Sequence, residues 1–151
     1  ALAIKLLATS DLSTAQLRER LTQRQFPGQE IEDTIVRLIN SRILDDNRTA
    51  LSYARRSATI KLRGRRRTQQ ELQARGIGTD VANQAVAVIF DELGESEVLE
   101  RAITKRLHKP LKNRIEFRRL HRFLVGQGFP SEAVSRALIS RTESNVSFVE
   151  E

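Results

Sequence analysis

The sequence predicts an all-α protein made of three tandem three-helix repeats, helix-turn-helix-like units in an elongated, curved array. Two observations lead to this prediction. One sequence phrase recurs three times at intervals of about fifty residues, a period typical of stacked helical units. No segment alternates apolar and polar residues as a half-buried strand does. We therefore divide the 151 residues into repeats at 1–44, 45–93 and 94–151, the last of which includes a C-terminal tail.

The recurring phrase predicts a helix, a tight turn and a second helix. It reads LRERLTQRQFPGQEIEDTIVRL at 17–38, TQQELQARGIGTDVANQAVAV at 68–88 and RLHRFLVGQGFPSEAVSRALIS at 119–140. Aligned on Phe26, Ile77 and Phe129, every copy has a leucine five residues earlier: Leu21, Leu72 and Leu124. In the second copy we expect Gly76 to take the left-handed position that ends the first helix, with Ile77 folding back over that end.

A further helix precedes each phrase, at roughly 1–8, 47–62 and 95–107. The middle one carries apolar residues on one face at helical spacing: Leu51, Ala54, Ala58 and Leu62. Asp45 and Asp46 stand just before this helix, where carboxylates cap the first turn. The nine helices thus fall into three groups of three.

The composition excludes several classes of protein. Cysteine is absent, which excludes disulfides, thiolate catalysis and cysteine-ligated zinc. No apolar run approaches the length of about 20 residues that a membrane span needs. With 39% hydrophobic and 30% charged residues, the chain is expected to be a cytoplasmic protein with no membrane partner.

The net charge of +7 is concentrated in two segments. Residues 55–75 contain eight basic side chains and one acidic one, and residues 101–122 contain nine basic side chains and one acidic one. The rest of the chain is net negative. Charge separated in this way produces a directed field that can steer a polyanion toward the protein.

No set of residues predicts catalysis or metal binding. His108 and His121 lack a carboxylate at metal-ligand spacing. Capping explains the Asp45–Asp46 pair better than acid–base chemistry does. The glycines at 64, 76 and 78 follow no strand and lack the spacing of a phosphate-binding loop. We expect no enzyme activity, no cofactor and no metal.

The repeats do not predict base-specific DNA reading. In a DNA-reading helix-turn-helix the second helix enters the major groove with Arg, Lys, Asn or Gln directed at base edges. Here the second helix at 79–93 contains three acidic residues and no basic one, and the helix at 29–40 contains three acidic residues and one Arg. The basic side chains lie on the first and second helices of the later repeats.

The stretch LRGRRRTQQEL at 62–72 has four arginines in five residues. Three interpretations remain open for them. They can form the solvated face of a helix, contact phosphates without sequence preference, or pair with carboxylates on a protein partner.

Two fragments contain recognisable motifs: ILDDNRTALSYARR at 43–56 has an LDD motif, and GRRRTQQELQARGI at 64–77 has a Glu-Leu…basic-Gly-Ile motif. With these motifs the chain resembles the RecX regulatory proteins of bacteria. RLHRFLVGQGF at 119–129 is also similar. Thr49 stands where the family usually has Phe, and Thr68 stands where it usually has an aliphatic residue. Both differences predict thinner packing in the second repeat.

The resemblance implies a mainly inhibitory modulator of RecA recombinase, acting in homologous recombination, DNA repair and the SOS response. Such proteins are built of tandem three-helix units and lie in the groove of the RecA filament on single-stranded DNA. There they limit ATPase activity, strand exchange and LexA cleavage. We expect a monomer that binds RecA and the RecA–DNA filament, with direct binding to single- or double-stranded DNA left open. The alternative is a sequence-nonspecific nucleic-acid-binding protein that acts without RecA.

The resemblance also assigns motif positions, and the charge pattern adds contact positions. Matched to the motif are Asp45, Asp46, Arg48, Gly64, Arg67, Glu71, Leu72, Arg75, Gly76 and Ile77. We predict that Asp45, Leu72 and Gly76 have structural roles. The predicted contacts with RecA or DNA are Arg48, Arg55, Arg63, Arg65, Arg66, Arg67, Arg75, Arg114, Arg118 and Arg122. Among these, Arg63, Arg65 and Arg66 are expected at the surface.

Overall fold

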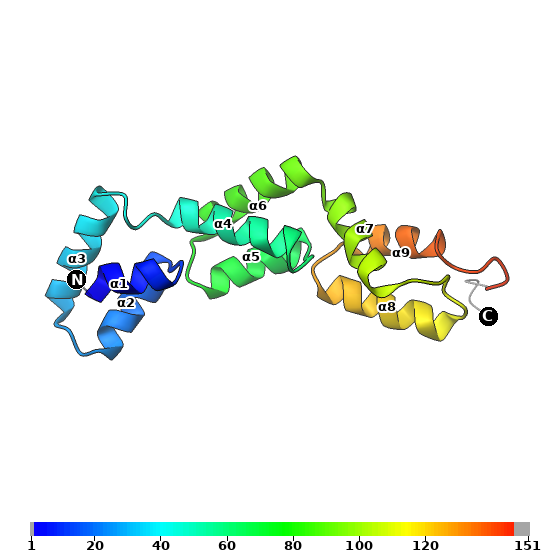
Figure 1. Ribbon diagram of the computed structural model, residues 1–151, viewed down its shortest axis with the longest axis horizontal. Helices are drawn as coiled ribbons and strands as arrows, with labels where there is room; N and C mark the ends of the chain where they lie inside the picture. Colours follow the sequence, from blue (N-terminus) through cyan, green and yellow to red (C-terminus); the bar gives the residue numbers. More distant parts are fainter. Residues whose placement is uncertain (1, 147–151) are drawn as a thin grey trace. The chain divides into compact units, whose positions relative to one another are not determined.

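The computed structural model describes residues 2–146, which form nine helices and no strand (Figure 1). The helices are α1 (Leu2–Thr9), α2 (Thr14–Gln23), α3 (Gly28–Asn40), α4 (Asp46–Thr59), α5 (Arg65–Ala74), α6 (Thr79–Leu93), α7 (Glu95–Arg106), α8 (Arg114–Gly126) and α9 (Ser131–Ile139). The only extended pairing in this range is an isolated bridge between Leu111 and Thr142. The predicted all-α class is confirmed.

Two compact units make up the described chain. The first contains the residues up to Ala54 together with Gln69–Val88, and the second contains Arg55–Thr68 and the residues from Ile89 onward. This division passes through α4, α5 and α6, whereas the sequence period places its boundaries between helices. The repeat boundaries at 44/45 and 93/94 therefore stay a prediction.

The turn inside each sequence repeat has one hydrogen-bond pattern. In every copy the anchor residue donates its backbone N–H to the carbonyl of the leucine five residues earlier. The three bonds are Phe26 N to Leu21 O (3.4 Å), Ile77 N to Leu72 O (3.1 Å) and Phe129 N to Leu124 O (3.3 Å). The residue before each anchor has a positive φ: 65° at Gln25, 82° at Gly76 and 100° at Gly128. These are Schellman-type helix ends, so the predicted left-handed position of Gly76 is confirmed.

In the first unit, the turn between α5 and α6 packs against the start of α2. A Cβ added to Gly76 would lie 2.4 Å from the Cβ of Ala15, so only glycine permits this approach. Ser13, which is buried, donates its hydroxyl to the carbonyl of Arg75 at 2.6 Å. The same Ser13 Oγ accepts the backbone N–H of Gln16 and caps α2.

In the second unit, the turn between α8 and α9 packs against the start of α5 in a similar way. Gly64 N donates to Gln127 O at 2.9 Å, and Arg66 N donates to Gly128 O at 3.3 Å. A Cβ at Gly64 would lie 2.5 Å from Gly128 O, and a Cβ at Gly128 would lie 2.4 Å from Arg67 N. Glycine is thus required on both sides of this backbone-to-backbone contact.

The turn between α2 and α3 differs because it has Gln25 in the left-handed position. Its anchor, Phe26, is 38% exposed, whereas Ile77 and Phe129 are 3% and 2% exposed. The first copy of the phrase therefore keeps the turn but not the burial that accompanies glycine in the other two.

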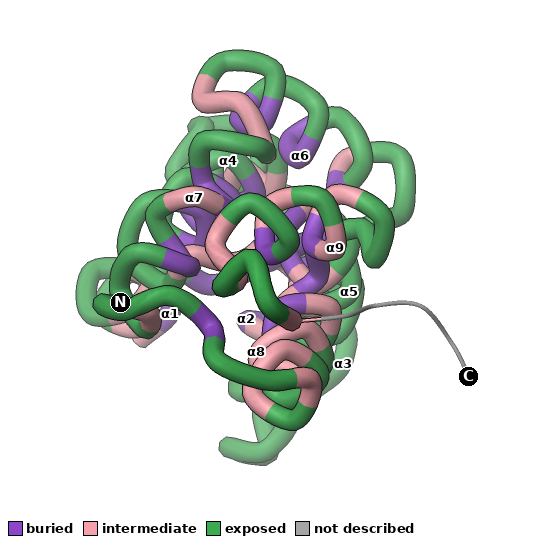
Figure 2. The backbone as a smooth tube through the Cα atoms, turned by 90° about the vertical axis from the view of Figure 1, so that its right-hand side faces the viewer, coloured by how far each residue is buried: buried purple, intermediate pink, exposed green. Residues whose placement is uncertain are grey.

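The buried face of α4 includes two of the four predicted residues, Ala54 and Ala58, but not Leu51 or Leu62. Leu51 is 37% exposed, α4 ends at Thr59, and Leu62 lies outside the helix with a φ of 54°. The buried residues of α4 are Thr49, Ala50, Tyr53, Ala54, Ser57 and Ala58. Tyr53 and the small residues beside it thus form the buried face of α4. Figure 2 shows buried stretches alternating with exposed ones along α6, as expected for an amphipathic helix.

Candidate functional site

The three residues of the LDD motif, at 44–46, have three different structural roles. Leu44 is 2% exposed and belongs to the core of the first unit. Asp45 caps α4, because its Oδ1 accepts the backbone N–H groups of Asn47 (3.0 Å) and Arg48 (3.2 Å). Asp46 bonds a different helix: its Oδ1 accepts both the backbone N–H (2.8 Å) and the hydroxyl (3.0 Å) of Thr14 at the start of α2. The motif therefore joins α4 to α2.

Arg48 holds the connection between α3 and α4. Its Nη1 donates to Arg42 O at 3.0 Å and its Nη2 donates to Ile43 O at 2.9 Å. These carbonyls follow the end of α3, where a cation is favoured by the helix dipole. The guanidinium is exposed, but its forked donors bond the chain itself.

Tyr53, Glu71 and Arg75 form a cluster in the first unit. The Tyr53 hydroxyl donates to the Glu71 carboxylate, and the Arg75 guanidinium lies 4.2 Å from the centre of the Tyr53 ring. A cation over an aromatic face is attracted by the ring quadrupole. The predicted motif residues Glu71 and Arg75 are therefore brought together by Tyr53, which the sequence analysis did not identify.

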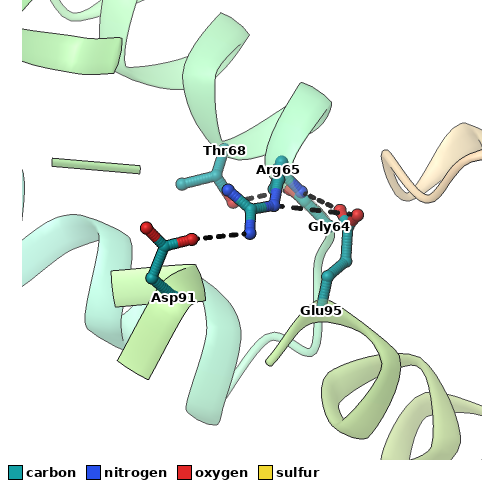
Figure 3. A network of polar contacts seen from close by, with 5 residues as sticks. All are labelled: Gly64, Arg65, Thr68, Asp91 and Glu95. Atoms are coloured by element: carbon teal, nitrogen blue, oxygen red, sulfur yellow. Dashed lines mark hydrogen bonds and ion pairs between the residues drawn. The ribbon is translucent and has the colours of Figure 1, made fainter. Parts of the chain in front are cut away.

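Arg65 is held by two carboxylates in the second unit (Figure 3). Its backbone N–H donates to Glu95 Oε2 at 2.7 Å, and its Nη2 donates to Asp91 Oδ1 at 3.1 Å. Its Nε lies 3.9 Å from Glu95 Oε1, and its guanidinium lies 5.6 Å from the centre of the Phe90 ring. The side chain of Glu95 is only 18% exposed. The Arg65 side chain is 40% exposed, but it bonds the start of α5 to α6 and α7, and its contact with a partner stays a prediction.

Other predicted contact arginines of this segment also bond within the second unit. Arg55 forms an ion pair with Glu92 at 2.9 Å, with both side chains about half exposed. Arg67 is half-buried, and its Nη1 donates to Gly126 O at 3.5 Å, at the end of α8. Arg63 is half-buried and donates its backbone N–H to Ser57 O. The surface position expected for Arg63 is therefore wrong.

Arg66 differs from these neighbours. It is exposed, and its side chain forms no hydrogen bond or ion pair with the described part of the chain. Only its backbone N–H is engaged, in the bond to Gly128. Arg66 is therefore the predicted contact residue of 63–67 that is available to a partner.

The two threonines that depart from the family pattern are both buried. Thr49 is 9% exposed, and Thr68 is fully buried. The Thr68 hydroxyl lies 2.8 Å from the hydroxyl of Ser57, also fully buried, and donates to Gly64 O at 2.9 Å. A buried hydroxyl pair thus takes the place of apolar packing between α4 and α5, so the predicted thinning is absent at Thr68.

The predicted contacts of the third repeat lie along α8. Arg118 and Arg122 are exposed and Arg114 is half-buried. The next arginine, Arg119, was missed by the sequence analysis, although the adjacent pair at 118–119 signals it. Arg119 lines a groove of about 600 Å³ with Arg106, Lys109, Lys112 and Phe123.

Within residues 2–146, no group of three or more His, Asp or Glu side chains is arranged to hold a metal ion. His121 instead contacts the Ser135 hydroxyl at 3.0 Å. None of the described helices combines the length and apolar character needed to cross a bilayer.

The family comparison decides what these motifs belong to. Residues 1–38 match the family model described as RecX, first three-helix domain, and residues 45–86 match RecX, second three-helix domain. The chain belongs to the RecX family. Curated relatives named regulatory protein RecX include one from Chromohalobacter salexigens, 30% identical over 94% of this chain and 91% of the relative. Another, from Prosthecochloris aestuarii, is 30% identical over 90% of this chain and 88% of the relative.

Solved structures agree on the fold. The crystal structure of RecX from Lactobacillus salivarius superposes with a TM-score of 0.73 over 91% of this chain and 90% of that one, at 20% identity. A crystal structure titled regulatory protein RecX gives 0.70 over 90% of this chain and 67% of that one. Membership of the RecX family supports a regulatory role for this chain.

Proposed function

We propose that this chain restrains RecA recombinase by binding RecA and its filament on single-stranded DNA. In this proposal it lies in the filament groove and limits ATP hydrolysis, strand exchange and LexA cleavage. The observation that carries the proposal is the family relation, which extends over 94% of the chain at 30% identity. The proposed setting is the cytoplasm, where the RecA filament forms.

The mechanism needs binding alone. The LDD motif, the Tyr53–Glu71–Arg75 cluster and the Arg65 network are all saturated with bonds inside the chain. They fix the helices and leave Arg66 and the α8 arginines to meet a partner. Many weak contacts with neighbouring filament subunits would add through effective concentration, so inhibition needs no bond-making step and no cofactor.

The decisive experiment measures DNA-dependent ATP hydrolysis by RecA on single-stranded DNA while this protein is titrated in. We expect suppression at stoichiometric amounts or below. An unchanged ATPase rate over a wide concentration range would end the proposal.

A single substitution tests the surface that acts on RecA. Arg66→Ala is expected to weaken inhibition while leaving the free energy of unfolding nearly unchanged, because the side chain makes no bond within the described chain. Arg20→Ala is the matched control, since Arg20 is likewise exposed on a helix but lies in the first unit. Equal inhibition by both variants and the native protein would return Arg66 to a solvated role.

The second candidate function is nucleic-acid binding without RecA. The open arginines of α8 favour it, because they need no protein filament to attract phosphates. On this view, affinity for a bare single strand is high at moderate salt and RecA has no influence. The absence of ATPase suppression together with tight binding to bare DNA would support this alternative.

A further inference from the structure

Helix α8 has an arginine face with no partner in the described chain. Arg114, Arg118 and Arg122 follow one another at intervals of four residues. Arg119 is turned about 100° round the helix from Arg118 and lines the groove that contains Arg106. None of the four side chains forms a hydrogen bond, ion pair or ring contact with residues 2–146. In a segment with nine basic residues, the only basic side chain with such a bond is Arg106, which lies 3.6 Å from the centre of the Phe123 ring.

Four carboxylates of the second unit bond basic side chains outside α8. Asp91 and Glu95 bond Arg65, and Glu92 pairs with Arg55. Glu100 pairs with Arg141.

The single acidic residue of α8 is used at the helix start. Glu116 Oε2 accepts the backbone N–H of Lys112 at 2.9 Å, and its own N–H bonds the capping Asn113. Glu116 and the four carboxylates above are therefore not bonded to the arginine face.

An open groove with an apolar floor borders two of these arginines. It is lined by Phe117, Arg118, His121, Arg122, Val125 and Ser131 and measures about 480 Å³. The Phe117 and His121 rings stack with their centres 6.0 Å apart. His121 is held by Ser135 on α9, so the stacked ring pair is an anchored aromatic group in the groove beside Arg118 and Arg122.

This combination fits a nucleic-acid strand better than an acidic peptide. Residues four apart on a helix advance about 6 Å along its axis, so successive arginines can meet successive charges of a regular polyanion. A peptide of Asp or Glu supplies charge but no flat apolar groups to cover the ring pair. A single strand supplies both, because its phosphates are regular and its bases are free to stack on aromatic side chains. In a duplex the bases are paired and unable to reach such a floor.

We propose that the α8 strand face, defined as Arg114, Phe117, Arg118 and Arg122, binds single-stranded nucleic acid directly, with arginines on the phosphates and a base packed against the Phe117–His121 pair. This rests on the proposed function and deepens it: the face assigns the DNA contact to α8 and leaves Arg66 for RecA.

The test measures binding of a fluorescent oligothymidylate by anisotropy, without RecA, at a series of salt concentrations. Arg118→Ala/Arg122→Ala is expected to reduce the slope of log affinity against log salt by about 1.4, because each lost contact with a single strand contributes about 0.7. Arg20→Ala/Arg24→Ala is the matched control. It removes the same charge from two exposed arginines four residues apart in the first unit and is expected to leave the slope unchanged.

Two outcomes overturn the proposal. Equal changes in slope for both double variants would show a response to total charge and not to α8. Displacement of the oligothymidylate by polyglutamate of equal charge as effectively as by unlabelled strand would identify an acidic protein as the partner.

A second variant tests the base contact. Phe117→Leu keeps an apolar side chain in the half-buried position but removes the ring. We expect the preference for single-stranded over duplex DNA to fall by about tenfold, as for loss of one stacked base. An unchanged preference would contradict the base contact.

These results separate the strand face from the proposed function. If the α8 double variant binds DNA as the native protein does yet fails to inhibit RecA, the strand face is wrong and the RecA proposal stands. If the variant loses DNA binding while the native protein does not affect RecA, the strand face stands and the RecA proposal is wrong.

Discussion

Residues 55–75 and 101–122 carry almost the same charge but use it differently. In the first segment, six of eight basic side chains interact with the chain itself: Arg55, Lys61, Arg63, Arg65, Arg67 and Arg75. In the second, Arg106 is the one with such an interaction in residues 2–146. A dense run of arginines therefore does not by itself indicate a binding surface, because the same side chains can stabilise the fold through bonds within the chain.

The difference lies in where the carboxylates are. Asp91, Glu92 and Glu95 follow one another closely at the α6–α7 junction and reach Arg55 and Arg65. The second segment has only Glu116, which bonds backbone at the start of α8. Basic side chains that pair with nearby carboxylates stabilise the fold, whereas basic side chains without such a pair are available to a partner.

The largest expected effect comes from the glycine contact that fixes the first segment. Gly64→Ala should lower the free energy of unfolding by about 3 kcal/mol, because the new Cβ meets backbone atoms that cannot rotate away. Gly126→Ala is the control, since a Cβ there meets nothing within 4 Å, and it should stay within about 0.5 kcal/mol of the native protein. Urea denaturation measures both, and equal stabilities would refute the tight contact.

The buried hydroxyl pair of the first segment should have the next largest effect. Thr68→Val keeps the shape but leaves the Ser57 hydroxyl without this partner, at a cost of about 1–2 kcal/mol. Ser57→Ala/Thr68→Val removes both polar groups and should recover most of that loss. A double variant less stable than the single one, by urea denaturation, would contradict the pairing.

Matched arginine substitutions compare the two segments directly. Arg65→Ala should lower stability by about 1 kcal/mol, a value reduced for its partial exposure, whereas Arg118→Ala should change it by less than about 0.5 kcal/mol. Thermal unfolding measures both. If Arg118→Ala is the more destabilising change, α8 has an internal role and the comparison fails.

The smallest expected effect concerns an exposed pair outside both segments. The hydrogen bond from Arg18 (2.7 Å) lowers the pKa of Glu32 below its usual value, and the same bond raises the pKa of Arg18. A lowered folded-state pKa means that the stabilisation is present above the unfolded value of about 4.3 and is lost as pH falls through the folded value. Glu32→Gln should therefore be slightly less stable than the native protein at pH 7, and the difference should disappear in acid. A difference that grows on acidification, in urea titrations, would reverse the sign.

Features that repeat with a fixed spacing could be predicted from the sequence. Which side chains pair with one another in the fold could not. Leu72 and Ile77 are joined by one backbone hydrogen bond across the turn. Because the same five-residue spacing recurs in each repeat, aligning the repeats locates the turn. Asp45 caps α4 through groups two and three residues away, which is also local. The all-α class follows from such local rules.

The unpredicted contacts join residues distant in sequence. Arg65 meets acids 26 and 30 residues later, and nothing in the run of arginines distinguishes it from Arg66. Asp46 was expected to cap its own helix, but it bonds Thr14, 32 residues earlier. On α4 the predicted burial of Ala54 and Ala58 is confirmed, whereas Leu51 is exposed and the buried Tyr53 was not predicted.

The side chain of Gln25 limits which helices can pack against the turn between α2 and α3. The turns at Gly76 and Gly128 each pack against the start of another helix, and this close contact leaves no room for a side chain on the glycine. A duplicated unit placed upstream of the first turn would meet the Cβ of Gln25 instead of open space. Growth by gene duplication would need a glycine at that position first, whereas copies of the glycine-bearing units could be inserted without new adaptation. The residue in the left-handed position of each turn thus decides whether another helix can approach it as closely as at Gly76 and Gly128.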